Sequence, residues 1–291
     1  MIVPLVRTLR PKQWVKNIFV VAALVFSRHA TETAYLIKTA IALAAFCLVS
    51  GAVYTFNDVR DVEADRAHPT KKNRPIAAGQ LSERAALIAA GLIAAISIGA
   101  CAVLSLPLAG IVAFYAAQNV AYSVKLKHVA FVDVVVVAGG FLLRVLAGAV
   151  AIDVPASGWL LACTALVASY LGLGKRAHEL AWAARSGQAT KTRAALAGYR
   201  YPVVKWLMFI LAVATIGAYV AYTLDPHTVE FFGTNHLFWT APLVAAGILR
   251  FLSIALWNAK PEPPTEAMLR DPWFMLDLVA VSGTVVYIIY G

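Results

Sequence analysis

Four acidic side chains lie within eight residues of the stretch NDVRDVEAD, which begins at Asn57 directly after a long apolar segment. Asp58, Asp61 and Asp65 recur at i, i+3 and i+7, so a helical continuation of that segment would place them on one face. Crowded oxygen ligands suit Mg²⁺, which binds one or two carboxylates together with substrate phosphates. We therefore predict that Asn57, Asp58, Asp61 and Asp65 bind Mg²⁺, with a solvated loop of mixed charge as the simpler alternative.

Basic and polar groups stand at the ends of several other apolar segments. Membrane topology alone recruits Lys and Arg to such positions, and this explanation covers most of them. It covers Lys175 and Arg176 less well, because they end an apolar segment as LGLGKRAHEL, with Glu179 one turn later. The further candidates for binding a substrate are Lys16, Arg74, Tyr122, Lys125 and Lys127. A carboxylate cluster together with several cations suits magnesium-bound diphosphate chemistry on a lipid-embedded substrate.

Arg144 stands in the middle of the apolar segment FVDVVVVAGGFLLRVLAGA, and Asp133 lies near the start of that segment. The two residues are eleven positions apart, which is three helical turns and therefore one face. An arginine inside a membrane is costly and normally meets a carboxylate or a bound anion in a polar cavity. Arg144 and Asp133 are therefore candidate substrate-binding residues, with a purely structural ion pair as the alternative.

The composition indicates a membrane protein with many spans. Of the 291 residues, 61% are hydrophobic and only 14% are charged, about half the charged fraction of an ordinary soluble domain. Cys47, Cys101 and Cys163 each stand alone in apolar runs, which fits neither metal spacing nor a disulfide framework. The net charge of +10 could suggest nucleic acid, but short loops between spans explain it better, so no nucleic-acid partner is expected.

The apolar runs predict nine membrane-spanning helices, since about 20 residues cross the hydrocarbon core of a bilayer. Their expected ranges are 18–35, 36–56, 83–104, 107–124, 131–151, 158–174, 202–224, 237–257 and 272–290. Lys and Arg are concentrated in alternate loops, and only Arg28 and Lys38 break the pattern. The positive-inside rule then places the N-terminus and the charged loops in the cytoplasm and the C-terminus outside a plasma (inner) membrane.

The stretch NDVRDVEAD, followed by RPIAAG, resembles the NDxxDxxxD signature of the UbiA superfamily of intramembrane prenyltransferases. The resemblance covers essentially the whole chain. It implies an all-α, nine-helix UbiA-like bundle that forms a single integral membrane domain over 1–291, with active-site loops in the cytoplasm. In that superfamily the first acidic motif binds Mg²⁺ and a diphosphate, which carries over to Asn57, Asp58, Asp61 and Asp65.

The chain departs from the typical superfamily pattern after the sixth expected span. Typical members carry a second acidic motif, DxxxD, where this chain reads GKRAHEL. A basic pair there suits a phosphate held directly by cations. This replacement, the opening LRPKQWVKN and the segment GFLLRVLAGAVA resemble the decaprenyl-phosphate phosphoribosyltransferase branch. That resemblance implies transfer of 5-phosphoribose from phosphoribosyl diphosphate (PRPP) to a polyprenyl phosphate, for synthesis of cell-wall arabinan precursors.

In such a reaction Asp58 and Asp61 would be the catalytic pair, because they would hold Mg²⁺ on the departing diphosphate. Lys175, Arg176 and Arg144 would bind substrate phosphates. The acceptor phosphate is already ionised near neutral pH, so no strong general base is needed. Positioning and electrostatics would supply most of the rate.

Two other functions are compatible with parts of the pattern. Ordinary prenyl transfer from a prenyl diphosphate would be favoured by a DxxxD motif after the sixth expected span, and this chain lacks one. A transporter could use Arg144 and Asp133 as a relay, but no convincing internal repeat supports that class. Apolar helix faces would also allow a homo-oligomer, and the polar loop 182–200 could close over the site.

Overall fold

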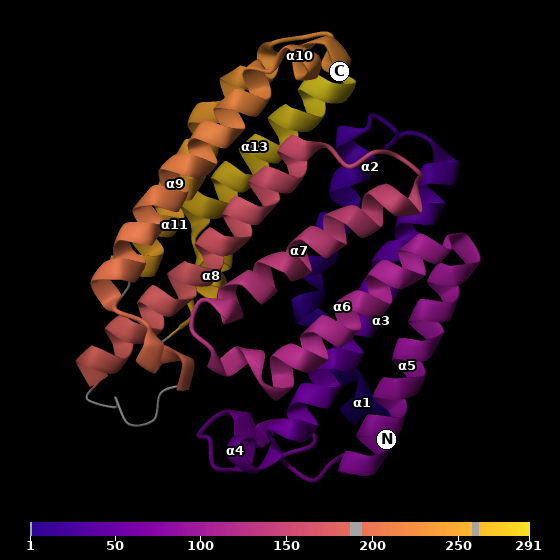
Figure 1. The fold of residues 1–291 in the computed structure, drawn as a ribbon, viewed down its shortest axis with the longest axis vertical. Coiled ribbons are helices and arrows are strands. Elements are labelled where there is room, and N and C mark those ends of the chain that lie inside the picture. The colour runs from indigo at the N-terminus through magenta and orange to yellow at the C-terminus, as the bar shows by residue number, and fades with distance from the viewer. Residues whose placement is uncertain (1, 187–193, 258–261) are drawn as a thin grey trace. The chain divides into compact units, whose positions relative to one another are not determined.

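The computed structural model describes residues 2–186, 194–257 and 262–291, and within those ranges it contains helices but no strands (Figure 1). The chain divides into two compact units. The first unit comprises Met1–Lys127 and Gly140–Ala156, and the second comprises His128–Gly139 and Ser157–Gly291. Helix α7 (Val132–Ala151) therefore contributes its beginning to the second unit and its remainder to the first. The single domain expected over 1–291 stays a prediction.

The first unit is organised around the long helix α3. Its elements are α1 (Ile2–Thr8), η1 (Pro11–Val21), α2 (Ala22–Phe26), α3 (Thr33–Arg60), α4 (Val62–Arg66), η2 (Lys71–Asn73), α5 (Glu83–Leu104), α6 (Leu106–Val124) and the last part of α7. Ala42, Phe46 and Val49 recur at helical spacing on α3 and are fully buried. They pack with residues of α5, α6 and α7 in one apolar core, which leaves the polar end of α3 as the part available for chemistry.

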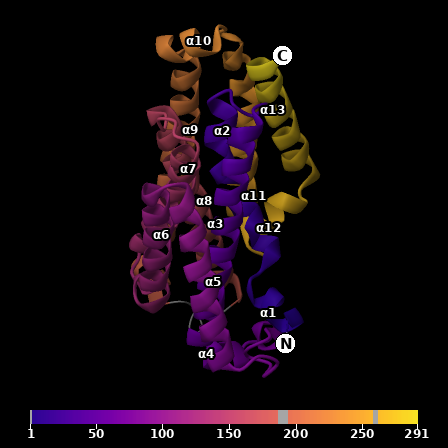
Figure 2. The ribbon, with the colours of Figure 1, turned by 90° about the vertical axis from the view of Figure 1, so that its right-hand side faces the viewer.

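The N-terminal segment is fixed against α3 by close contacts. Leu9 lies over Gly51, where an added Cβ would come within 3.0 Å of the leucine side chain. The hydroxyl of Thr55 donates a 3.1 Å hydrogen bond to the buried hydroxyl of Thr8. Leu5 of α1 also packs with the apolar residues around α4, and Figure 2 shows α1 beside α4 at one end of the unit. These contacts hold the residues that follow Leu9 near the acidic motif.

The second unit is a bundle of four long helices with short connecting elements. Its elements are the start of α7, α8 (Gly158–Ser186), η5 (Ala194–Gly198), α9 (Tyr201–Leu224), α10 (Pro226–Phe232), η6 (His236–Thr240), α11 (Ala241–Trp257), α12 (Pro264–Ala267), η7 (Met268–Arg270) and α13 (Pro272–Tyr290). Gly174 allows α8 and α11 to approach closely, since an added Cβ would meet the Phe251 ring at 2.6 Å. The Tyr170 hydroxyl donates to the carbonyl oxygen of Ile248 at 2.8 Å, so the polar group of this buried ring is satisfied.

Seven helices in the described part of the chain are long and apolar enough to cross a membrane. They are Thr33–Arg60, Glu83–Leu104, Val132–Ala151, Gly158–Arg185, Tyr201–Leu224, His236–Trp257 and Pro272–Tyr290. Each corresponds to one of the expected spans. The expected span over 107–124 is also helical, as α6, but is not among the seven, and Gln118 and Asn119 lower its hydropathy. The predicted count of nine is therefore not confirmed.

The helix predicted over 18–35 is wrong as a single element. The chain forms η1 and then the five-residue helix α2, and α3 begins only at Thr33. Arg28 adopts a left-handed backbone conformation with φ 64°, which a right-handed helix does not accommodate. The Ser27 hydroxyl donates to the carbonyl oxygen of Leu24 and satisfies one group at the end of α2. Two other helices are longer than expected, since α3 continues to Arg60 and α8 continues to Ser186.

Candidate active site

The acidic motif spans the end of α3 and the start of α4. Asn57 and Asp58 are in the last turn of α3, Asp61 is the residue at which that helix ends, and Asp65 lies on α4. The helix is thus interrupted at Asp61 instead of continuing through the motif. Asp58 and Asp65 are almost fully buried, at 2% and 3% exposure, so the break turns both carboxylates inward. Glu63 instead has a side chain that is 82% exposed and pairs with Arg66.

Each of the three aspartates in the motif is paired with a cation. Arg10 binds Asp58, and Arg74 donates from Nη1 both to Asp58 at 3.0 Å and to Asp65 at 2.6 Å. Lys127 donates from Nζ to the two carboxylate oxygens of Asp61 at 2.7 and 3.0 Å. Three carboxylates therefore face three cations, which leaves the cluster close to neutral in charge.

Asn57 completes this cluster from within the motif. Its amide donates to the Oδ2 of Asp61 at 3.1 Å, one helical turn ahead. The Asp61 side chain is 34% exposed and Lys127 is 12% exposed, so this pair lies closer to solvent than the Asp58 carboxylate. The cluster therefore has one accessible carboxylate and two that are reached only past their arginine partners.

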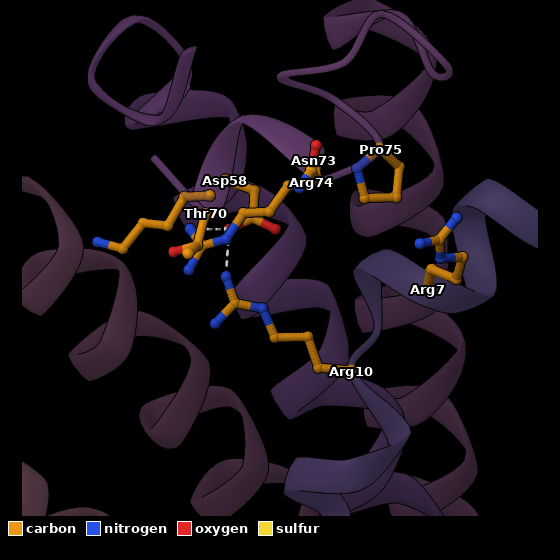
Figure 3. Close-up of a pocket in the computed structure, with 8 residues that line it drawn as sticks. Arg7, Arg10, Asp58, Thr70, Asn73, Arg74 and Pro75 are labelled. Atoms are coloured by element: carbon orange, nitrogen blue, oxygen red, sulfur yellow. Dashed lines mark hydrogen bonds and ion pairs between the residues drawn. The ribbon is translucent and has the colours of Figure 1, made fainter. Parts of the chain in front are cut away.

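A cavity of about 390 Å³ opens beside Asp58 (Figure 3). Four cationic side chains line it, from Arg7, Arg10, Lys71 and Arg74. Asp58, Thr70, Asn73 and Pro75 complete the lining. Figure 3 shows Arg10 and Arg74 directed at Asp58, whereas Arg7, on α1, lies apart from that contact. Seven of the eight lining residues have polar or charged side chains, and they carry more positive than negative charge.

Arg10 reaches Asp58 from an unusual backbone conformation. Its φ of 51° and ψ of 63° are left-handed, a region that residues other than glycine, asparagine and aspartate seldom adopt. Trp14 stabilises the turn by donating from Nε1 to the Leu9 carbonyl at 3.1 Å. Strained backbone of this kind is concentrated at functional sites, where surrounding contacts hold it in place. The conformation turns the Arg10 side chain toward the acidic motif.

Arg144 is buried in the first unit in a cage of neutral groups. Its Nε donates to the Oδ1 of Asn17 at 2.8 Å, its Nη1 to the carbonyl oxygen of Gly140 at 2.7 Å, and its Nη2 to the hydroxyl of Tyr115 at 2.8 Å. The guanidinium carbon lies 4.7 Å from the centre of the Tyr115 ring. Within the described ranges no carboxylate forms an ion pair with Arg144, so the alternative of a structural pair with Asp133 is wrong.

Asp133 takes part in a separate network in the second unit. It accepts a short hydrogen bond from the hydroxyl of Tyr199, and its Oδ2 lies 2.9 Å from the Nε of Arg176. Arg176 also binds Glu179, one turn later on α8. The Tyr199 oxygen in turn accepts from the backbone N–H of Phe131 at 2.7 Å. The network thereby joins the beginning of α7, the middle of α8 and Tyr199, which directly follows η5.

This second network is closed to solvent. Asp133 is 0% exposed and the Arg176 side chain 5%, while Glu179 is 27% exposed at its edge. Burial, reinforced by the Asp133 carboxylate, raises the pKa of the Tyr199 hydroxyl well above its ordinary range. Tyr199 therefore stays protonated and donates to Asp133. The arrangement is suited to orienting Arg176 and Glu179.

The remaining predicted site residues are spread over the two units. In the first unit Lys16 and Lys125 are exposed and Tyr122 is half-buried. In the second unit Lys175 is half-buried on α8, next to Arg176. The loop expected to close over the site covers 182–200, of which 187–193 lie outside the described residues.

Sequence reasoning did not assign three residues that the structure places in these networks. Arg10 binds Asp58, Asn17 holds Arg144, and Tyr199 holds Asp133. The chain separation within each pair is between 48 and 127 residues, so local spacing could not reveal it. Polar residues flanking or interrupting apolar segments were the only available signal.

Comparison with known proteins gives consistent matches along the whole length. Residues 17–270 match the UbiA prenyltransferase family. The chain is 35% identical to the decaprenyl-phosphate phosphoribosyltransferase of Mycolicibacterium smegmatis, over 98% of this chain and 92% of that protein. It is also 35% identical to the protein of the same name from Mycobacterium tuberculosis, over 96% of this chain and 92% of that protein.

A solved structure gives the corresponding match in three dimensions. A UbiA homologue from Archaeoglobus fulgidus, bound to GPP and Mg²⁺, superposes with a TM-score of 0.70 over 98% of this chain and 99% of that chain. The two sequences are 17% identical, so the likeness concerns the fold alone. The helical architecture of this chain is thus that of a known class of integral membrane protein.

Proposed function

The chain belongs to the UbiA prenyltransferase family of integral membrane proteins, and from that membership we propose that it transfers 5-phosphoribose from PRPP to a polyprenyl phosphate such as decaprenyl phosphate. The observation that carries the proposal is the 35% identity, over nearly the whole chain, with proteins named for that activity. The sequence GKRAHEL, basic where typical relatives are acidic, supports it.

Mg²⁺ is the proposed cofactor, and the residues of the acidic motif fit it by their chemistry. Asp58, Asp61, Asp65 and Asn57 offer hard oxygen ligands. In the described part of the chain no three acidic, histidine or cysteine side chains form a ready-made metal cage. This agrees with an ion that takes part of its coordination from substrate phosphates. Bound there, Mg²⁺ would withdraw charge from the departing diphosphate.

In this proposal the cations of the first unit bind the carboxylates of the motif in one state and substrate phosphates in the other. Arg10, Arg74 and Lys127 neutralise the carboxylates of the motif in the structure described above. With a metal and its diphosphate held by the carboxylates, the same cations would be available to phosphate oxygens. Arginine suits this exchange because its planar group binds carboxylate and phosphate equally well.

The bond changes need no general base from the protein. The bond from C1 of ribose to the diphosphate oxygen breaks, and a bond from C1 to an oxygen of the acceptor phosphate forms. The acceptor is a phosphate monoester that is ionised near neutral pH, so its oxygen is already nucleophilic. Positioning of the two reactants and stabilisation of the leaving charge are what the residues supply. A single displacement would invert the configuration at C1.

In the second unit, Lys175, Arg176 and Glu179 are proposed to act on substrate phosphates, and Asp133 to orient Arg176. Asp133 has no exposed surface, so a positioning role suits it better than direct contact with a substrate. Arg144, with Asn17, Gly140 and Tyr115 accepting from three of its N–H groups, is proposed to present its remaining donors to a phosphate.

The proposed location is the plasma membrane, with the N-terminus and the charged loops on the cytoplasmic side. Two observations support this orientation. PRPP is a water-soluble metabolite, and the charged loops carry the acidic motif that would bind it. The distribution of Lys and Arg among the loops follows the positive-inside rule.

The proposal is tested by a transfer assay on the purified chain in detergent, with radiolabelled PRPP, decaprenyl phosphate and Mg²⁺. We expect a lipid-soluble, acid-labile labelled product that disappears when EDTA removes the divalent ion. Product formation that persists in EDTA would contradict the metal assignment. Absence of product in the presence of all three components would contradict the reaction.

A further inference from the structure

Arg144 is a buried cation whose hydrogen-bond partners are all neutral. They are the amide oxygen of Asn17, the backbone oxygen of Gly140 and the hydroxyl of Tyr115. The ion pairs found in the described part of the chain do not include Arg144. The residue is 5% exposed and lies in a helix suited to span a membrane. A buried charge without a counter-ion is costly, so this arginine is expected to meet an anion that its neighbours do not supply.

Asn17 is fixed in the orientation that presents its oxygen to Arg144. Guanidinium N–H groups can only donate, so the atom that faces them is Oδ1, at 2.8 Å. The amide nitrogen donates to the Ser50 hydroxyl at 3.3 Å and to the Cys47 sulfur at 3.4 Å. Ser50 accepts there because its own proton goes to the carbonyl oxygen of Cys47 at 3.1 Å. The fully buried amide is therefore satisfied on both sides and holds the arginine in one geometry.

An aspartate at position 17 would have nearly the same shape but a different charge. It would give Arg144 the carboxylate partner that an intramembrane arginine commonly finds. The Ser50 hydroxyl could turn and donate to the second carboxylate oxygen. For stability alone, a carboxylate is the better partner of a cation that is already buried. The amide of Asn17 instead orients Arg144 and leaves its positive charge uncompensated.

We infer that Asn17 is a positioning residue, which orients Arg144 and reserves its charge for the phosphate of the lipid acceptor. The inference rests on the proposed function, since it takes a polyprenyl phosphate as the acceptor. A guanidinium has five N–H groups, of which Asn17, Gly140 and Tyr115 accept from three, so two remain for a ligand. Two donors on one planar group match the paired oxygens of a phosphate.

The surroundings of Arg144 suit a phosphate that is attached to a lipid. The rings of Phe46, Tyr115 and Phe141 have their centres 4.7 to 5.8 Å from its guanidinium carbon. Phe46 and Tyr115 also belong to the apolar core of the first unit. Arg144 stands well inside the apolar helix Val132–Ala151. A polyprenyl phosphate joins one anionic group to an apolar chain, whereas a sugar phosphate carries only polar groups, so the lipid is the better match.

One face of α3 links this buried arginine to the acidic motif. Ser50, Tyr54 and Asp58 recur at i, i+4 and i+8, which is the helical spacing of a single face. Ser50 contacts Asn17, and the ring centre of Tyr54 lies 5.1 Å from the guanidinium carbon of Arg10. Arg10 in turn pairs with Asp58. An acceptor phosphate near Asn17 and a donor held at the motif would lie along one helix face, as transfer between them requires.

The test measures binding of farnesyl phosphate, a short polyprenyl phosphate, without PRPP, so that no turnover occurs. Radiolabelled farnesyl phosphate is dialysed to equilibrium against the full chain in phosphatidylcholine nanodiscs, with empty nanodiscs as the blank for partition into lipid. Farnesol, which is the same chain without the phosphate, is measured alongside. The variant is Asn17→Asp. Its matched control is Asn235→Asp, which makes the same chemical change at an exposed position.

We expect Asn17→Asp to weaken binding of farnesyl phosphate by about tenfold or more, because the new carboxylate compensates the charge of Arg144 and repels the phosphate. Binding of farnesol and of PRPP should not change, nor should any binding by Asn235→Asp. In the transfer assay the KM for decaprenyl phosphate should rise while that for PRPP stays the same. The free energy of unfolding of Asn17→Asp should be equal to or higher than that of the wild type, since the buried cation gains a counter-ion. A purely structural role would not weaken phosphate binding in a variant that is equally stable.

Binding of farnesyl phosphate at the wild-type level in Asn17→Asp would overturn the inference, and so would an equal loss for farnesol. A loss confined to PRPP would assign Arg144 to the donor and overturn the assignment to the acceptor. Failure of the proposed function gives a different result, because the wild-type chain would then transfer no label from PRPP, whatever its affinity for farnesyl phosphate.

Tyr115→Phe keeps the inference falsifiable if Asn17→Asp does not fold. It removes one hydrogen-bond acceptor of Arg144, keeps the ring and adds no charge. With its orientation less well fixed, Arg144 should bind farnesyl phosphate about two- to tenfold more weakly, and farnesol should bind as before. Unchanged binding of farnesyl phosphate in Tyr115→Phe would contradict a role for this arginine in holding the acceptor.

Discussion

Asp58, Asp61 and Asp65 of the first unit and Asp133 of the second are all paired with basic side chains, but the two sets differ in solvent access. In the first unit the Asp61 side chain is 34% exposed, and Arg10 and Arg74 are 26% exposed. In the second unit Asp133 is 0% exposed and Arg176 is 5% exposed. The same residue types therefore form two different arrangements. The first unit has an accessible cluster beside a cavity, made of Asp58, Asp61 and Asp65 with Arg10, Arg74 and Lys127. The second unit has a sealed network, made of Asp133, Arg176 and Tyr199.

The difference matters because exposure sets what an ion pair can do. Partly exposed pairs contribute about 0–1 kcal/mol, so a metal ion or a phosphate can replace one partner at little cost. Breaking a buried pair by removing one partner costs about 3–5 kcal/mol, because the other charge is left uncompensated. The accessible cluster is suited to exchange partners during a reaction, and the sealed network to hold a side chain in place.

The largest effect is expected for Asp61→Asn, which removes an accessible carboxylate of the motif. Phosphoribosyl transfer should fall by about 10²–10³-fold, the usual cost of losing one electrostatic contact to a transition state. Stability should change by less than about 1 kcal/mol, because the lost pair with Lys127 is partly exposed. The initial rate of transfer, measured over a range of Mg²⁺ concentrations, checks this.

Glu63→Gln is the matched control for that variant. Glu63 lies two residues further along the same motif, but its side chain is 82% exposed and binds Arg66. It should keep wild-type activity. Equal activity losses in the two variants would mean that overall negative charge, and not the Asp61 carboxylate itself, matters for transfer.

The next largest effect is expected in the sealed network, where a substitution should lower the stability of the protein. Asp133→Asn should lower the free energy of unfolding by about 3–5 kcal/mol, because Arg176 keeps its charge in a buried site without that partner. Reversible unfolding of the detergent-solubilised chain measures it. Asp153→Asn is the control, since Asp153 is exposed and its left-handed backbone, with φ 57°, suits asparagine. A loss below about 1 kcal/mol for Asp133→Asn would show that solvent reaches the network.

A packing change should have a somewhat smaller effect. An added Cβ at Gly148 would lie 1.9 Å from the carbonyl oxygen of Val20, so Gly148→Ala must push η1 and α7 apart. We expect a loss of about 1–3 kcal/mol in the free energy of unfolding. Gly99→Ala, on α5, has open space around it and should be neutral or stabilising by up to about 1 kcal/mol. Losses of equal size in the two variants would contradict this account of the close approach.

The smallest effect is expected for Tyr199→Phe. It deletes a hydroxyl that donates to Asp133 and accepts from the N–H of Phe131, while the ring stays in place. The loss should be about 1–3 kcal/mol, below that of Asp133→Asn, because Arg176 still pairs with the carboxylate. The free energies of unfolding of Tyr199→Phe, Asp133→Asn and the double variant should show that the two residues are energetically coupled. Additive losses would mean that Tyr199 and Asp133 act independently.

Regular helices were predictable from the sequence, because long apolar runs specify them locally. The expected range 83–104 coincides with α5, and the range 272–290 with α13. The region around 18–35 was not predictable in the same way. Its interruption depends on the left-handed Arg28 and on packing of η1 against Gly148, neither of which leaves a local pattern.

The candidate site was predictable in its acidic half and less so in its basic half. Asp58, Asp61 and Asp65 stand together in the sequence, so their spacing is visible. Their partners Arg10 and Lys127 come from distant segments and look like ordinary membrane-border cations. Only the fold distinguishes a cation that binds the motif from one that marks topology.

One measurement tests the central claim most directly, which is that the accessible cluster serves phosphoribosyl transfer. The purified chain is given PRPP and geranylgeranyl diphosphate together, with different radiolabels, along with decaprenyl phosphate and Mg²⁺. The account predicts that label from PRPP enters the lipid product, that label from the prenyl diphosphate does not, and that Asp61→Asn lowers the transfer by about 10²–10³-fold. Transfer of the prenyl label alone would contradict the account and assign ordinary prenyl transfer to this chain.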